Sequence, residues 1–184
     1  MGVANTTSSS AIVAALLDRK PEDVTDGGSG LSEPDLRHKI EVIRKGLAFH
    51  TRRDPLDVLS AFGGFEHAAI VGGILEAYTT EKPILLDGFV VGAAALVAAM
   101  IDPNVKQNFI FAHRSGMKGS GILLEALGCT KPILDFGMSL GEGTGALTAW
   151  PIVRQASHIL WEMSEFEQAE VTDSTAILRS KGLL

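Results

Sequence analysis

The residues best suited to chemistry form a short glycine-rich segment in the last third of the sequence. Glu142 stands between Gly141 and Gly143, so a planar ligand could approach its carboxylate closely. If that carboxylate is partly buried, its pKa rises and Glu142 becomes a competent general base. A solvated glutamate in a surface turn explains the same pattern equally well, so the segment alone leaves both interpretations open.

A second group of candidate residues follows a predicted strand. His113, Arg114 and Ser115 come directly after the apolar segment Asn108–Ala112. Arg114 could pair with a phosphate, Ser115 could donate a hydrogen bond, and His113 could act as a general base. A lone histidine is more often structural, and the sequence contains no G-x-S-x-G nucleophile elbow, which argues against a Ser–His–Asp triad.

An acidic residue ends another predicted strand. Asp87 and Gly88 follow the apolar residues 84–86. An aspartate in this position either meets a ribose hydroxyl or caps a following helix, and the sequence does not separate these two roles.

Two segments near the N-terminus could hold a phosphate. Asn5, Thr6 and Thr7 stand at a predicted helix start, where unpaired N–H groups and a partial positive charge suit an anion, although simple capping is the commoner role. The second segment is a glycine cluster whose backbone N–H groups could approach an anion, although a plain turn is its commoner explanation. Its candidate residues are Gly27, Gly28, Ser29 and Gly30.

Alternating helices and short strands must position these residues. Apolar periodicity predicts helices over about residues 6–18, 32–47, 55–63, 65–78, 89–101, 120–127 and 145–166. Residues 83–87 and 108–112 are predicted as buried strands, 132–135 as a third strand or extended segment, and Pro21 with residues 26–30 as a loop.

Apolar strands that alternate with helices are typical of a parallel sheet covered by helices on both faces. In such sheets, ligands bind beyond the carboxyl ends of the strands. Those ends carry Asp87, residues 113–115 and residues 140–145. The topology therefore predicts that these separate segments meet in one site.

The composition limits the class of partner. The 184 residues suffice for one compact domain, and their formal net charge of −6 argues against nucleic-acid binding, which usually requires a basic stripe. The longest apolar run, residues 89–101, is too short to span a bilayer and is expected to be a core helix, so we expect no membrane association. The single cysteine and the lack of a signal-peptide pattern lead us to expect a cytoplasmic protein.

Six segments together resemble one known family in their order and spacing. They are MG-x-x-NTTS at 1–8, G-x-[ST]-G at 27–30, GGFE at 63–66, DGF at 87–89, AHRS at 112–115 and LGEGTGA at 140–146. This set is similar to the nicotinate-nucleotide–dimethylbenzimidazole phosphoribosyltransferase family, and the similarity extends to about residue 171.

The resemblance implies a helix-rich, Rossmann-like α/β fold in three layers around a parallel sheet. It also implies transfer of the 5-phosphoribosyl group from nicotinate mononucleotide to 5,6-dimethylbenzimidazole, giving α-ribazole 5′-phosphate and nicotinate for cobalamin assembly. Glu142 is then the general base, and neither a metal nor another cofactor is implied. The substrate-binding residues that it implies are Asn5, Thr6, Thr7, Gly27, Gly28, Ser29, Gly30, Asp87, Gly88, His113, Arg114, Ser115, Leu140 and Gly141.

Members of that family are considerably longer than this chain. We therefore expect residues 1–170 to be the C-terminal portion of the α/β domain, with an incomplete sheet whose exposed apolar edges favour a homodimer. Residues 171–184 are expected to form a tail, either mobile or exchanged as a swapped arm. Two alternatives stay open: the same chemistry with adenine or a phenolic acceptor, or an inactive fragment that only binds nucleotide.

Overall fold

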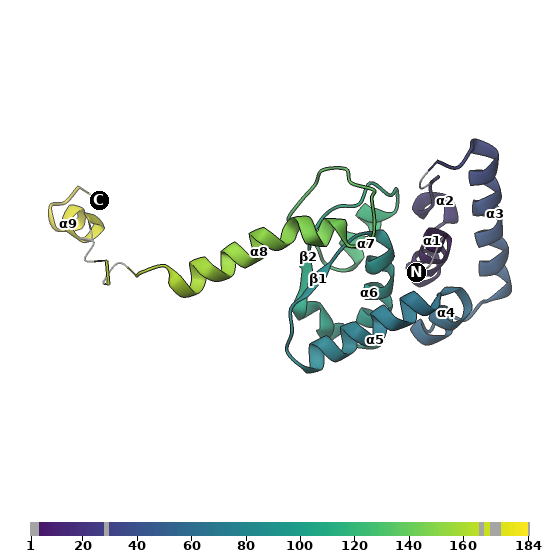
Figure 1. The fold of residues 1–184 in the computed structure, drawn as a ribbon, viewed down its shortest axis with the longest axis horizontal. Coiled ribbons are helices and arrows are strands. Elements are labelled where there is room, and N and C mark those ends of the chain that lie inside the picture. The colour runs from purple at the N-terminus through teal and green to yellow at the C-terminus, as the bar shows by residue number, and fades with distance from the viewer. Residues whose placement is uncertain (1–3, 28–29, 166–167, 170–173, 184) are drawn as a thin grey trace. The chain divides into compact units, whose positions relative to one another are not determined.

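A computed structural model of the protein describes residues 4–27, 30–165, 168–169 and 174–183. The chain divides into two compact units, Met1–Ala149 and Trp150–Leu184 (Figure 1). All of the residues predicted for the site belong to the first unit.

Helices make up most of the first unit, and their bounds follow the predicted ones closely. They are α1 (Asn5–Leu16), α2 (Pro21–Val24), α3 (Glu33–Phe49), α4 (Pro55–Phe62), α5 (Phe65–Thr79), α6 (Phe89–Ile101), α7 (Ser120–Ala126) and the first part of α8 (Thr144–Glu162), with the 3-10 turn η1 (Pro103–Asn108). Two of the starts are set by capping side chains. Ser32 accepts a hydrogen bond from the backbone of Asp35, and Asp54 accepts one from Leu56.

Two local predictions are wrong. Pro21 does not lie in a loop but begins α2, because the fixed φ of proline suits the first position of a helix. The cap of α1 is Ala4, which has a left-handed backbone with φ 66° and no side-chain cap hydrogen bond. Asn5, Thr6 and Thr7 already belong to the helix, so they cannot serve as its N-cap.

The predicted parallel sheet is present and small. Strand β1 (Ile84–Leu86) pairs in parallel with β2 (Phe109–Phe111), with Leu85 opposite Ile110. The third predicted segment, 132–135, is extended and joins through a parallel bridge between His113 and Leu134. The helix-rich α/β fold predicted from the sequence is confirmed, and the three carboxyl ends that were expected to share an edge do so.

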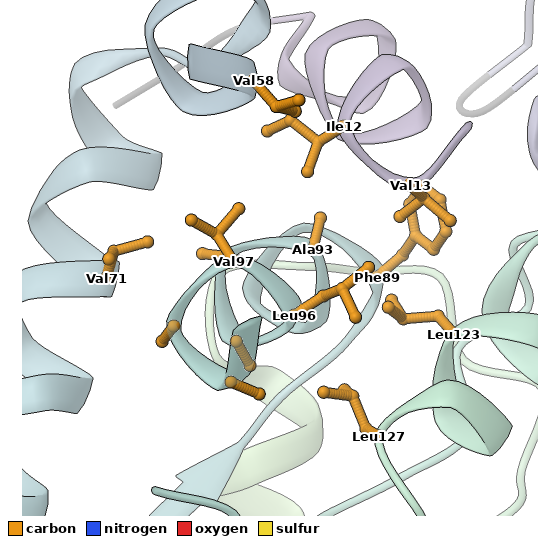
Figure 2. Close-up of a cluster of buried hydrophobic side chains, with 14 of the residues drawn as sticks. Ile12, Val13, Val58, Val71, Phe89, Ala93, Leu96, Val97, Leu123 and Leu127 are labelled. Atoms are coloured by element: carbon orange, nitrogen blue, oxygen red, sulfur yellow. The ribbon is translucent and has the colours of Figure 1, made fainter. Parts of the chain in front are cut away.

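The core of the first unit surrounds α6, as expected for its long apolar run. Most of α6 is buried, largely through alanines that let its neighbours approach closely. Figure 2 shows Ala93, Leu96 and Val97 of α6 in the middle of this core. Side chains from α1, α4, α5, α7 and the residue after α7 surround them: Ile12, Val13, Val58, Val71, Leu123 and Leu127. None of the helices in the described ranges has the length and apolarity needed to cross a membrane.

The second unit contains the rest of α8 and helix α9 (Ser174–Ser180), which lies in the expected tail and was not predicted. None of the described residues of this unit is buried. Several large apolar side chains of α8 are exposed instead, including Trp150, Leu160 and Trp161. This part of α8 therefore presents apolar surface.

Candidate active site

A cavity of about 490 Å³ lies in the first unit, where the strand ends meet the start of α1. Its volume falls within the range of small-molecule sites, roughly 300–1,000 Å³. The structure brings nine of the predicted residues to its wall: Asn5, Thr6, Asp87, Gly88, His113, Ser115, Leu140, Gly141 and Glu142. Segments up to 137 positions apart in the sequence, from Asn5 to Glu142, therefore line one space. The topology predicted this meeting for the three strand-end segments, whereas only the family resemblance linked Asn5 and Thr6 to them.

The other predicted residues do not line this cavity. Thr7, Gly27 and Gly30 are absent from its wall. The side chain of Arg114 is exposed and pairs with Asp135, its Nε lying 3.0 Å from the carboxylate Oδ2. Gly28 and Ser29 fall outside the described residues.

The loop that carries Glu142 has an uncommon backbone. Gly141, Glu142 and Gly143 have φ values of 73°, 55° and 79°, so three successive residues are left-handed. For glutamate this conformation costs on the order of 1–2 kcal/mol, whereas glycine adopts it freely. The Thr144 hydroxyl and N–H both donate to the Gly141 carbonyl, at 2.7 and 3.0 Å, which closes the turn before α8. Such strain in a cavity wall is typical of functional loops.

Glu142 itself is exposed. The burial that the sequence argument required for a general base is therefore not supplied by the described residues of this chain. A ligand seated on Leu140 and Gly141, which also line the cavity, would have to supply it.

Asp87, at the carboxyl end of β1, fixes the start of α8. Its Oδ1 accepts a hydrogen bond from the Ala146 N–H at 3.0 Å, so the capping role is observed, although for α8 and not for the next helix. The same oxygen lies 3.6 Å from His113 Nε2. The imidazole of His113 packs so closely on Gly145 that a Cβ there would overlap the ring. These contacts attach the Glu142 loop to the strand ends.

Sequence reasoning missed a buried cation beside the start of α1. Lys39 of α3 is 8% exposed, and its Nζ donates to Thr6 Oγ1 at 3.0 Å and to the Asp26 carbonyl at 3.2 Å. Desolvation by burial lowers the pKa of this ammonium group, and the Asp26 carboxylate opposes that shift. The sequence did contain a signal, because Lys39 interrupts the apolar face of α3 four residues before the buried Ile43.

Two further residues at the start of α5 were also missed. Glu66 lines the cavity, and its neighbour His67 is fully buried behind it. Burial lowers the pKa of His67, and the nearby Glu66 carboxylate opposes the shift. Periodicity pointed to this position as well, because His67 precedes the buried residues Val71 and Ile74 by four and seven residues.

The remaining wall is mostly apolar. Its apolar side chains are those of Ala4, Ile70, Phe89, Val90, Val91, Met117 and Met138, and Ser139 and Gly143 complete it. A polar rim of carboxylates and helix-start N–H groups beside an apolar wall suits a ligand with a charged end and a planar, apolar end.

Comparison with known proteins agrees with this geometry. Residues 1–171 match the sequence profile of a family described as phosphoribosyltransferase. A nicotinate-nucleotide–dimethylbenzimidazole phosphoribosyltransferase of Vibrio atlanticus is 44% identical over 172 residues, which cover 94% of this chain and 50% of that protein. The enzyme of the same name from Geotalea uraniireducens is 44% identical over 175 residues, covering 94% and 49%.

A solved structure shows the same fold. The crystal structure of CobT from Thermus thermophilus superposes with a TM-score of 0.88 at 42% identity, covering 94% of this chain and 52% of that one. The chain therefore belongs to the nicotinate-nucleotide–dimethylbenzimidazole phosphoribosyltransferase family. It spans about half the length of the curated relatives that it matches.

Proposed function

We propose that this chain carries the reacting groups for transfer of a 5-phosphoribosyl group from nicotinate mononucleotide to 5,6-dimethylbenzimidazole. The products are α-ribazole 5′-phosphate and nicotinate, as used in cobalamin lower-ligand assembly. The observation that carries the proposal is the single cavity in which Glu142, the strand ends and the start of α1 meet. The names of the relatives support the choice of substrates.

The phosphate end of the nucleotide is assigned to the start of α1. The first N–H groups of a helix lack partners within the helix and carry a partial positive charge. Asn5 and Thr6 line the cavity at this start, and the Lys39 ammonium group lies directly behind Thr6. Glu66 and Asp87 offer carboxylate oxygens to the ribose hydroxyls farther along the wall.

The aromatic base is assigned to the apolar wall and the Glu142 loop. A benzimidazole that lies against Leu140 and Gly141 would cover Glu142 and remove its carboxylate from water. Glu142 then takes the N–H proton from one ring nitrogen while the other nitrogen attacks the anomeric carbon. The C–N bond to the pyridinium breaks with its electron pair going to nicotinate, so the leaving group needs no proton. Attack from the opposite face inverts the anomeric centre.

The test is release of nicotinate when the full chain is incubated with both substrates. We expect release in the wild type and a fall of roughly 10²–10⁴-fold in Glu142→Gln, the range for removal of a general base. The Gln side chain keeps the size and loses only the basic group. Equal rates in the two proteins would contradict the assignment of Glu142.

The same assay separates the two alternatives. Nicotinate release with adenine or phenol but not with dimethylbenzimidazole would assign another acceptor. Measurable binding of nicotinate mononucleotide without any release would favour a nucleotide-binding fragment. Calorimetric titration of the chain with the nucleotide alone supplies that second measurement.

A homodimer in the cytoplasm is part of the same proposal. The exposed apolar residues Trp150, Leu160 and Trp161 on α8 support an interface between copies. A cytoplasmic location, where thiols stay reduced, suits the single Cys129. Light scattering should give twice the chain mass of 19.5 kDa, and Trp161→Glu should shift the mass towards the monomer. A monomeric wild type would contradict the dimer.

A further inference from the structure

A fully buried histidine beside the cavity has both of its ring nitrogens engaged. Nδ1 of His67 lies 3.2 Å from the backbone nitrogen of Gly64, which precedes α5. Nε2 lies 3.0 Å from the hydroxyl of Ser9 in α1. That hydroxyl in turn donates to the backbone carbonyl of Asn5, at 2.8 Å. A single ring thus joins two helix starts that are far apart in the sequence.

Only one arrangement of protons satisfies these three contacts. The Gly64 N–H is a donor, so Nδ1 must accept and carries no proton. The one hydroxyl proton of Ser9 is used on Asn5, so its oxygen must accept from Nε2–H. The chain of hydrogen bonds therefore runs in one direction, from Gly64 through His67 and Ser9 to Asn5, and requires a neutral ring protonated on Nε2.

One end of this hydrogen-bond chain lies in the wall of the cavity, and the residue next to its histidine lies there too. Asn5, the last acceptor, lines the cavity at the start of α1. Glu66, which precedes His67, lines it at the start of α5. His67 itself does not belong to the wall. The position of both wall residues thus depends on a ring behind them.

We propose that His67 is a positioning residue for the nucleotide: its Nε2–H tautomer holds the first turn of α1 against the start of α5 and so sets the places of Asn5 and Glu66. The proposal rests on the proposed function, because it takes the nucleotide to occupy this cavity. His67 touches no substrate and acts only through these two neighbours.

Burial of the ring favours the neutral form, although a nearby carboxylate opposes it. The one ionisable group described in contact with the ring is the Glu66 carboxylate, whose Oε1 lies 3.5 Å from Nδ1. Ser9 and Asn5 of α1 bring no charge to the ring. Burial lowers the pKa of His67 and outweighs the opposing effect of Glu66. Protonation would replace the acceptor at Nδ1 with a donor facing the Gly64 N–H.

Two substitutions test the two hydrogen bonds of the ring separately. His67→Gln places an amide N–H near the position of Nε2 and keeps the bond to Ser9. His67→Asn places a carbonyl oxygen near the position of Nδ1 and keeps the bond to Gly64. Each variant loses one hydrogen bond of similar strength, so their melting temperatures should fall by similar amounts.

Affinity for nicotinate mononucleotide should nevertheless differ between them. By calorimetric titration of the full chain, we expect His67→Asn to raise Kd about tenfold, the factor for one lost buried hydrogen bond. His67→Gln should stay within about twofold of the wild type because α1 remains attached. Adding Ser9→Ala to His67→Asn should cost little more, since both changes cut the same link. Equal affinities of the Gln and Asn variants would overturn the proposal.

Measuring the tautomer of the His67 ring tests the proposal independently of nucleotide binding. A ¹⁵N-edited spectrum of the wild-type histidines at pH 7.5 should show His67 neutral and protonated on Nε2. A ring that is charged, or protonated on Nδ1, would overturn the proposal. Wild-type protein that shows the expected tautomer but binds no nicotinate mononucleotide would contradict the proposed function and leave the tethering of α1 to α5 supported.

Discussion

Two exposed glutamates in this protein share the same left-handed backbone conformation, but its structural cause differs between them. Glu81 and Glu142 both have φ 55°, a region that favours glycine. Glu81 follows the end of α5: its N–H donates to the Tyr78 carbonyl, and the Lys82 N–H donates to the Ala77 carbonyl. This is the Schellman pattern, in which the residue after the helix is left-handed in order to satisfy the last carbonyls.

No helix end explains the conformation of Glu142. It stands ahead of α8, between two glycines that are also left-handed, in a loop that lines the cavity. A left-handed glutamate is therefore not evidence of function by itself, since Glu81 is accounted for by the hydrogen bonds of a helix terminus. What distinguishes Glu142 is the cavity and the packing of its loop on His113.

The largest difference between the two glutamates should be in catalysis. Glu81→Gln should leave nicotinate release within about twofold of the wild type, because Glu81 does not line the cavity, whereas Glu142→Gln should lose roughly 10²–10⁴-fold. Both substitutions remove one exposed carboxylate from the same backbone conformation. Equal losses in the two variants would break the comparison and point to a general effect of charge.

The attachment of the Glu142 loop to His113 should give the next largest effect. A methyl group in Gly145→Ala would overlap the buried imidazole, and overpacking of this kind costs about 1–3 kcal/mol. We expect a lower free energy of unfolding in urea, together with slower nicotinate release because the loop must move.

The control for that change is a glycine with open space around it. Gly73 of α5 has no heavy atom within 4 Å of a built Cβ, so Gly73→Ala should stabilise the helix by about 0.5–1 kcal/mol. Destabilisation by both substitutions, to the same degree, would show that the His113 contact is not what holds the loop.

Much of the fold could be predicted because its signals are local. Apolar periodicity and Gly or Pro punctuation give the bounds of α3 through α6 to within about two residues. The meeting of Asp87, His113 and Glu142 could be predicted because parallel strands place their carboxyl ends on one edge. Local patterns and the general topology of parallel sheets were enough to predict these helix bounds and this meeting of strand ends.

The parts that were missed depend on contacts between distant elements. Lys39 reaches Thr6 and Asp26 from another helix, and His67 reaches Ser9 across 58 positions. Both side chains stand at helical spacing from buried apolar residues, a signal that the sequence prediction did not use and that could not have named their partners. The predicted N-cap of α1 was wrong for a related reason. Residue type suggested Asn5, whereas the backbone conformation of Ala4 determines where the helix begins.

The smallest effect on stability should come from replacing each glutamate with glycine, which relieves the same backbone cost. Glu81→Gly and Glu142→Gly should each raise the free energy of unfolding, by roughly 0.5 kcal/mol, because glycine adopts positive φ freely but gains entropy in the unfolded chain. The two variants should differ in activity: Glu81→Gly should keep nicotinate release, and Glu142→Gly should lose it. Urea denaturation and the release assay on the same samples measure both quantities. A stabilised Glu142→Gly that stays active would mean that the loop needs its conformation but not its carboxylate.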